Sequence, residues 1–393
     1  MPGDKSISHR ALILGAIAEG ITEIKGFLPS EDCLATAQCL RQMGIKIDID
    51  GDFARVHGQG LHGLSAPKDV LYVGNSGTTL RLLTGLLSGQ KFNSIIDGDQ
   101  SIRKRPMDRV IIPLTEMGAK IKSSDGFAPI HITGSKLRGI SYKMQINSAQ
   151  VKSAIMLAGL YAEGKTAVQE AKPGLTRNHT EIMLRHMGKN VPRGTFFDIP
   201  GDFSSAAFFI VAGLLLADDG LLIENVGINP TRTGLLDALA QMGADIQLQS
   251  KMRLGGEDVA DILVKKSPLK GIVLQGGLVA RMIDEVPIFA VAAMFAKGVT
   301  IICDAQELAV KESNRIETVA AEFSKMGAKI AATEDGMVID GGHNICAAVV
   351  DSRGDHRIAM SLAIAALNAQ GQSVITNTEC VNTSFPSFFN KIL

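Results

Sequence analysis

The chain has 393 residues, which exceeds the usual size of one hydrophobic core, so two domains are expected. Lysine plus arginine balances aspartate plus glutamate at 40 each, which excludes a broadly basic surface for nucleic acid or an acidic membrane. Five cysteines form no CxxC pair, and the longest apolar run, about 12 residues, is too short to span a bilayer. With no recognisable signal peptide, the composition predicts a cytoplasmic protein without nucleic-acid or membrane partners.

The chain opens on PGDKSISHR, where a turn leads into an apolar stretch of helical length. Ser6 or Ser8 is expected to cap this helix, which places Lys5 and Arg10 near its positive end. Cations at that end are unfavourable unless an anion joins them. The stretch therefore fits either an ordinary capped helix with solvated charges or an anion site.

Six segments along the chain repeat one pattern, in which a polar turn precedes an apolar helix, a glycine and an alternating strand. A second series of Met-Gly pairs interleaves with the first, and each pair closes an amphipathic helix before a strand. Two interleaved series indicate internal repetition in units of about 70 residues. The glycines of the first series are expected to be helix C-caps: Gly20, Gly89, Gly164, Gly220, Gly298 and Gly371. Those of the second series are Gly44, Gly118, Gly188, Gly243 and Gly327.

The six apolar helices are hydrophobic on nearly all sides, so we expect them to be buried. The strands alternate, so one face of each sheet should meet water. Helices inside and half-exposed sheets outside invert the usual layering of α/β proteins. The six units divide into two lobes of three, residues 1–198 and 199–393, and the short spacing after Gly188 predicts that the third unit lacks a hairpin.

Unusual residues gather at the expected N-termini of these six helices, where backbone N–H groups and the helix dipole favour anions. We expect the six ends to line one shared cleft between the lobes. Recurrence at equivalent positions argues against a set of separate solvated charges. Further cations lie in the connecting loops: Arg103, Arg105, Arg177, Lys311 and Arg315.

Two carboxylates stand among these cations. Asp284 lies at the expected start of the fifth buried helix, and Glu312 lies between Lys311 and Arg315. One interpretation is plain ion pairing, and the other is a general acid and a general base whose pKa values are set by burial and nearby charge. The histidines show no metal spacing, and the GxGxxG match at residues 58–63 is followed by Pro67, which breaks the helix that a dinucleotide site needs.

The stretches PGDKSISHRAL, GNSGTTLR, GDQSIRKRPMD, NSAQVKSA, PGDFSSAAFF, IDEVPI, VKESNRI and GDHRIAMS resemble, in this order, the motifs of the 5-enolpyruvylshikimate-3-phosphate synthase family. The resemblance implies an α/β fold of two domains, each an inside-out α/β barrel of three βαβαββ repeats. It also implies that the C-terminal lobe lacks the usual N-terminal crossover strand, because the chain begins at the first motif.

The activity implied by the resemblance is transfer of the enolpyruvyl group of phosphoenolpyruvate to the 5-hydroxyl of shikimate 3-phosphate, with release of phosphate. This is a step toward chorismate and the aromatic amino acids, and the herbicide glyphosate inhibits it. No cofactor and no metal are expected, and the partners are the two small substrates of a monomeric enzyme.

The resemblance also assigns roles to residues. Proton transfers fall to Asp284, Glu312 and Lys5. Shikimate 3-phosphate is expected to bind Lys5, Ser6, Arg10, Ser148, Ala149, Gln150, Arg177, Asp284 and Lys311. Phosphoenolpyruvate is expected to bind Lys5, Asn75, Gly77, Thr78, Arg105, Gln150, Arg315 and Arg357, with support from His356.

Two alternatives remain open on the sequence. The sister transferase that acts on UDP-N-acetylglucosamine typically carries a cysteine loop before an Arg-Pro dipeptide, where this chain has Gln100. The other alternative is a non-catalytic or impaired homologue, weakened by the missing N-terminal strand and hairpin. The intact cleft residues, among them Asp284, Glu312 and Arg357, argue against such decay.

Overall fold

The computed structural model describes residues 1–188 and 192–392. The chain packs as two compact units, which are described one at a time. The N-terminal unit comprises Pro2–Pro200 with Arg253–Glu257, and the C-terminal unit comprises Met1, Gly201–Met252 and Asp258–Leu393. The boundary that the sequence suggested after residue 198 stays a prediction.

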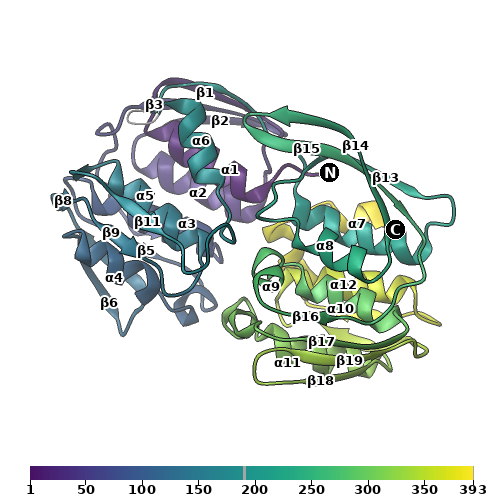
Figure 1. The fold of residues 1–393 in the computed structure, drawn as a ribbon. Coiled ribbons are helices and arrows are strands. Elements are labelled where there is room, and N and C mark those ends of the chain that lie inside the picture. The colour runs from purple at the N-terminus through teal and green to yellow at the C-terminus, as the bar shows by residue number, and fades with distance from the viewer. Residues whose placement is uncertain (189–191, 393) are drawn as a thin grey trace. The chain divides into compact units, whose positions relative to one another are not determined.

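Two sheets of the N-terminal unit share one topology, with strand orders β12-β1-β3-β2 and β4-β5-β7-β6 (Figure 1). In both sheets the first pair is parallel and the other two pairs are antiparallel. Two short parallel pairs, β10-β8 and β11-β9, complete the unit. The strands are β1 (Glu19–Lys25), β2 (Lys46–Asp50), β3 (Phe53–Gln59), β4 (Leu71–Tyr72), β5 (Ser94–Asp97), β6 (Lys120–Ser124), β7 (Phe127–Thr133), β8 (Leu137–Arg138), β9 (Ser141–Lys143), β10 (Ala162–Glu163), β11 (Ala167–Gln169) and β12 (Phe196–Asp198).

Three apolar helices form the core of this unit: α1 (Lys5–Ala16), α3 (Gly77–Ser88) and α5 (Ala149–Gly159). Every residue of α1 after its first two is buried, as its apolar sequence predicts. Helices α3 and α5 pack closely because a Cβ on Gly85 would lie only 2.2 Å from the Ala154 carbonyl oxygen. The other helices are α2 (Glu31–Gln42), η1 (Ile102–Lys104), α4 (Asp108–Glu116) and α6 (His179–Met187).

The C-terminal unit repeats the same strand topology in its sheet β16-β17-β19-β18. A three-stranded sheet, β13-β15-β14, and a parallel pair, β20-β21, make up the rest. The strands are β13 (Leu221–Gly227), β14 (Asp245–Leu254), β15 (Glu257–Lys265), β16 (Val273–Leu274), β17 (Gly298–Ile302), β18 (Lys329–Ala332), β19 (Met337–Gly341), β20 (Val349–Asp351) and β21 (Val374–Thr376).

Three further apolar helices form the core of the C-terminal unit: α7 (Phe203–Leu216), α10 (Val286–Phe295) and α12 (His356–Leu367). Within this unit they lie inside, with the sheet of β13, β14 and β15 on one side and that of β16–β19 on another (Figure 1). The remaining helices are α8 (Gly234–Gln241), α9 (Gly277–Arg281), η2 (Gln306–Val310), α11 (Arg315–Lys325), η3 (Thr378–Thr383) and α13 (Phe388–Ile392).

These arrangements confirm the internal repeat and the α/β fold with buried helices. The role expected of the first glycine series is wrong in detail. Only Gly89 is a C-cap, with a φ of −93°. The others lie beyond the helix end: Gly20 and Gly298 in the first residues of strands β1 and β17, Gly164 directly after β10, and Gly220 and Gly371 between a helix and the next strand. The Met-Gly series fits better, because its glycines all adopt positive φ directly after their helices.

The hairpin expected to be missing falls between Gly188 and Asp198, and residues 189–191 lie outside the described residues. In the described part of the chain, no helix has the length and apolar character needed to cross a membrane.

Candidate active site

The first turn of α1 carries the residues that raised the question of an anion site. Asp4 caps the helix, with its Oδ1 accepting the N–H of Ile7 at 2.9 Å. The expectation that Ser6 or Ser8 is the cap is wrong, because the helix begins one residue before Ser6. An aspartate directly before the first helical residue is the favoured cap geometry.

Both cations of α1 are held by protein groups. The Nζ of Lys5 lies 2.6 Å from Oδ2 of Asp32 at the start of α2. The guanidinium of Arg10 donates to Thr180 Oγ1 and to Ser153 Oγ, both at 2.7 Å. Arg10 is thus fixed among α1, α5 and α6, whereas the side chain of Lys5 keeps 19% of its surface exposed. Lys5 is the more accessible of the two to a ligand.

A second group of candidates surrounds the first turn of α3. The buried Arg105 donates to Asn75 Oδ1 and, at 3.2 Å, to Ser101 Oγ. A Cβ on Gly77 would lie 3.1 Å from a terminal nitrogen of Arg105, so glycine lets this guanidinium approach the backbone. A guanidinium beside the N–H groups of a helix start is a geometry that binds anions.

Arg81, which the sequence analysis did not single out, belongs to this group. It donates to Gln150 Oε1 at 2.6 Å, and Gln150 in turn donates to Thr78 Oγ1 at 3.0 Å. The same nitrogen of Arg81 would lie 2.9 Å from a Cβ on Gly77. A signal for Arg81 existed, since it follows Gly77 by four residues and therefore lies on the same helix face.

The candidates at α5 and α6 include a capped helix start and a loop arginine. Ser148 caps α5, accepting the N–H of Val151 at 3.4 Å, and Ala149 is the first helical residue. Arg177 is half-buried in the loop before α6. Ser148 thus lies at the start of α5, and Arg177 lies in the loop that precedes α6.

Lys152 holds the loop that carries Arg177. Its Nζ is nearly buried and lies 2.7 Å from the carboxylates of both Glu170 and Glu181. Glu170 also accepts the N–H groups of Leu175 and Thr176 at 3.2 and 3.3 Å. Burial alone would raise the pKa of Glu170, but the Lys152 contact and these N–H groups lower it below its ordinary value.

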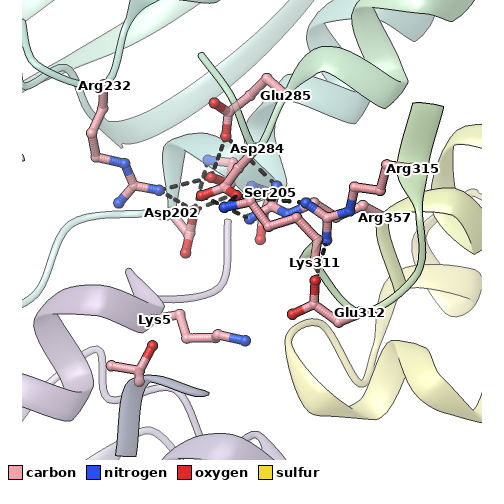
Figure 2. A network of polar contacts seen from close by, with 12 residues as sticks. Lys5, Asp202, Ser205, Arg232, Asp284, Glu285, Lys311, Glu312, Arg315 and Arg357 are labelled. Atoms are coloured by element: carbon pink, nitrogen blue, oxygen red, sulfur yellow. Dashed lines mark hydrogen bonds and ion pairs between the residues drawn. The ribbon is translucent and has the colours of Figure 1, made fainter. Parts of the chain in front are cut away.

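In the C-terminal unit, Asp284 faces three cations (Figure 2). Its carboxylate lies 3.3 Å from Lys311 Nζ, 3.6 Å from NH1 of Arg315 and 4.0 Å from NH2 of Arg357. Helix α10 starts at Val286, so Asp284 precedes the helix rather than beginning it. Three cations stabilise negative charge on this carboxylate.

Arg315 links the two candidate acids of this unit. Its side chain is 1% exposed, and its NH2 lies 2.7 Å from Oε2 of Glu312. The buried Asp355 accepts its Nε at 2.8 Å. Burial alone would lower the pKa of Arg315, but attraction to Asp355, Glu312 and Asp284 raises it above its ordinary value. Arg315 therefore remains a cation that fixes the acids around it.

The start of α12 supplies the last candidates. Asp355 caps this helix, accepting the N–H of Arg357 at 2.9 Å, and His356 is its buried first residue.

Arg103, in the N-terminal unit, differs from the other candidate cations, since its side chain is 55% exposed and pairs with Asp97. The interpretation as a solvated surface charge suits Arg103, unlike the buried Arg105.

The candidates thus form two groups, one in each unit. The N half-site contains Lys5, Ser6, Arg10, Asn75, Gly77, Thr78, Arg105, Ser148, Ala149, Gln150 and Arg177. The C half-site contains Asp284, Lys311, Glu312, Arg315, His356 and Arg357. The expectation that all of them line one cleft stays a prediction. Among the described residues, no group of three or more His, Cys, Asp or Glu side chains could hold a metal ion.

Comparisons with known proteins give one consistent result. The sequence model of the family described as EPSP synthase (3-phosphoshikimate 1-carboxyvinyltransferase) matches residues 1–392. A 3-phosphoshikimate 1-carboxyvinyltransferase of Thermoanaerobacter sp. (strain X514) is 52% identical, over 99% of this chain and 95% of that protein. The enzyme of the same name from Brevibacillus brevis is 50% identical, over 100% and 96% of the two chains.

Solved structures agree. An EPSP synthase from Acinetobacter baumannii superposes with a TM-score of 0.86 at 46% identity, covering 99% of this chain and 93% of that one. The enolpyruvyl transferase NikO from Streptomyces tendae, at 16% identity and a TM-score of 0.79, covers 99% and 92% of the two chains and shares the fold.

Lys152→Met is expected to lower the free energy of unfolding by about 3 kcal/mol at pH 7, because two partly buried carboxylates lose their cation. The pKa of Glu170 is depressed in the folded state, so its contribution is present above the unfolded pKa of about 4.3 and is lost as the pH falls through the folded value. Urea unfolding at pH 7 and pH 3 should therefore show a smaller loss of stability on acidification in the variant. An equal loss in both proteins would contradict this role of Lys152.

Proposed function

The chain belongs to the EPSP synthase family, the 3-phosphoshikimate 1-carboxyvinyltransferases, and on this premise we propose that its two half-sites together carry out that family's reaction. The enolpyruvyl group passes from phosphoenolpyruvate to the 5-hydroxyl of shikimate 3-phosphate, and phosphate is released. The observation that carries the proposal for the C half-site is the Asp284–Arg315–Glu312 cluster, which holds two carboxylates on one buried guanidinium.

Phosphoenolpyruvate is assigned to the guanidinium groups of Arg105, Arg315 and Arg357, together with Lys5 and the first turn of α3. The close approach of Arg105 to Gly77 supports this, because it places a cation beside free helix N–H groups. Asn75, Thr78 and Gln150 complete the assignment, and His356 supports it from α12. The same guanidinium groups stabilise the phosphate as it leaves, so no metal is needed for that step.

Shikimate 3-phosphate is assigned to the first turns of α1 and α5, to Arg177, and to a carboxylate and an ammonium of the C half-site. The anchored loop of Arg177 and the capped start of α5 support this, since both present donors to a phosphate. The residues are Lys5, Ser6, Arg10, Ser148, Ala149, Gln150, Arg177, Asp284 and Lys311.

Proton transfer is assigned to Asp284, Glu312 and Lys5. In the addition step, a proton is added to the methylene carbon of phosphoenolpyruvate while the 5-hydroxyl loses one, and elimination then removes a proton from the new methyl group as phosphate departs. Asp284, ionised among three cations, suits the acceptor of the hydroxyl proton. The 5-oxygen forms the new bond to the carbon that bears the phosphate. Glu312 and Lys5 donate the proton to the methylene carbon in the addition and take it back in the elimination, and the proton held by Asp284 passes to the departing phosphate or to water.

Nothing in the comparisons or in the described residues favours the alternative of a non-catalytic homologue. The candidate acids, Asp284 and Glu312, are present and paired with cations rather than replaced or exposed. We further propose that the chain works as a cytoplasmic monomer without nucleic-acid or membrane partners. Its balance of 40 basic and 40 acidic residues supports the absence of those two kinds of partner.

The direct test of the activity is a coupled phosphate-release assay. The wild-type chain should release phosphate only when phosphoenolpyruvate and shikimate 3-phosphate are both present, with one enolpyruvyl product per phosphate. Binding of both substrates without release would support the non-catalytic alternative. Replacing shikimate 3-phosphate with UDP-N-acetylglucosamine should give no release.

Asp284→Asn and Glu312→Gln should each lower kcat by about 10²–10⁴-fold, because each removes a proton-transfer group while keeping its shape. Asp237→Asn is a matched control, since Asp237 is an exposed carboxylate that also pairs with an arginine of the same unit. The melting temperature should change little in all three. A kcat within a few-fold of the wild type would remove the affected residue from proton transfer.

Gly77→Ala should raise the glyphosate concentration needed for half inhibition by about tenfold or more. The added methyl group would meet nitrogens of Arg81 at 2.9 Å and Arg105 at 3.1 Å, so the guanidinium groups around a small phosphonate must shift. Gly159→Ala is the control, because its methyl group would be similarly crowded, 3.0 Å from Thr166, but at the far end of α5. Unchanged inhibition of the Gly77 variant would exclude this residue from the inhibitor site.

A further inference from the structure

Glu285, which directly follows the candidate base Asp284, has a buried carboxylate that the proposed mechanism does not use. It occupies the N-cap position of α10, yet its side chain makes no capping hydrogen bond to that helix. A short acid such as aspartate at this position typically accepts the free N–H groups of its own helix. The carboxylate of Glu285 instead contacts other elements, so capping of α10 does not account for its position.

The partners of Glu285 come from two other core helices (Figure 2). Its Oε1 accepts the hydroxyl of Ser204 in the first turn of α7. The same oxygen lies 3.6 Å from Nη1 of Arg357 in the first turn of α12. Ser204 Oγ in turn accepts NH2 of Arg232 at 2.8 Å. The other oxygen of Glu285, Oε2, is buried and accepts no hydrogen bond from the described residues.

Burial of the Glu285 carboxylate costs free energy, and apolar packing does not offset this cost. The Glu285 side chain has no exposed surface, and burial of an ionised carboxylate is unfavourable unless a cation compensates it. Arg357 is the cation with which it forms an ion pair, and 12% of the Arg357 side chain remains exposed. Glu285 thus holds the inner side of a guanidinium whose outer side is accessible.

Arg357 is shared by two consecutive acids. Its NH2 lies 4.0 Å from Asp284, and its NH1 lies 3.6 Å from Glu285. Asp284 is proposed to gain and lose a proton in each turnover, and its attraction for the guanidinium falls whenever it is protonated. Glu285 is buried away from water and takes no part in the proposed proton transfers, so its contact with the guanidinium does not depend on them.

We propose that Glu285 is a positioning residue that holds Arg357 in place for phosphoenolpyruvate, independently of the protonation of Asp284. This inference rests on the proposed role of Arg357 in binding phosphoenolpyruvate. Glu285 itself touches neither substrate and acts through the arginine, with Ser204 and Arg232 fixing its own orientation.

The test measures the Michaelis constants for phosphoenolpyruvate and for shikimate 3-phosphate separately, because only the first should change. Glu285→Gln keeps the shape and a hydrogen-bonding partner for Ser204 but removes the charge that holds Arg357. The KM for phosphoenolpyruvate should rise about tenfold, while the KM for shikimate 3-phosphate stays within twofold and kcat falls less than threefold. Glu322→Gln is the matched control, because Glu322 is another buried, ion-paired carboxylate of the same unit, with Lys325 and Arg353 as partners. It should leave both Michaelis constants unchanged, even if stability drops.

A double-mutant cycle separates action through Arg357 from a general effect. In an Arg357→Lys background, Glu285→Gln should change the KM for phosphoenolpyruvate by less than threefold, because the partner on which it acts is already altered. Glu285→Asp, which keeps the charge, should recover most of the lost affinity and also serves if the glutamine variant does not fold. A full tenfold effect of Glu285→Gln in the lysine background, or an unchanged KM for phosphoenolpyruvate in the Glu285→Gln single variant, would overturn the proposal. The wild-type chain is assayed alongside, so a failure of the wild type to release phosphate would instead contradict the proposed function.

Discussion

A buried helix can present its first turn to a ligand only when protein groups, rather than water, hold the charges placed there. This constraint organises both units. Asp32 holds Lys5 at the start of α1, and Asp355 holds Arg315 beside the start of α12. Each cation is thereby held in place where little water surrounds it, and its interaction with an arriving anion is stronger there than in bulk water. The inverted layering, with helices inside and sheets outside, brings such first turns together within each unit.

Anchoring also separates cations by function. Arg10 and Arg315 are almost wholly buried and donate to protein partners, so they fix the geometry of the side chains around them. Lys5, Lys311 and Arg357 keep part of their surface accessible. Lys5 pairs with Asp32, whereas Lys311 and Arg357 each pair with two carboxylates, one of which is Asp284 in both cases. Under the proposed function, both half-sites hold these charged groups in place before the substrates bind, and the substrates add ion pairs to those already present.

Much of this organisation could be predicted from the sequence. The regular spacing of apolar helices, Met-Gly pairs and strands predicts the internal repeat, because such a periodic pattern can be recognised in a single sequence. What could not be predicted are partners far apart in the chain: Asp32 for Lys5, Ser204 for Glu285, and Asp355 for Arg315. The predicted cap of α1 is also wrong. Asp4 rather than a serine caps this helix, which begins where the Asp4 carboxylate can accept the N–H of Ile7. The sequence pattern predicts which helix N-termini carry the candidate residues. The partners of their side chains can be identified only in the folded structure.

The proposed function requires the N-termini of the core helices to bind the two anionic substrates. A crystal structure with shikimate 3-phosphate and an unreactive phosphoenolpyruvate analogue bound tests this most directly. The account predicts phosphate oxygens about 3 Å from Arg177 and from the first-turn N–H groups of α5, with the analogue's anionic groups on Arg105 and Arg357. Both ligands ordered elsewhere, with these four positions unoccupied, would contradict it.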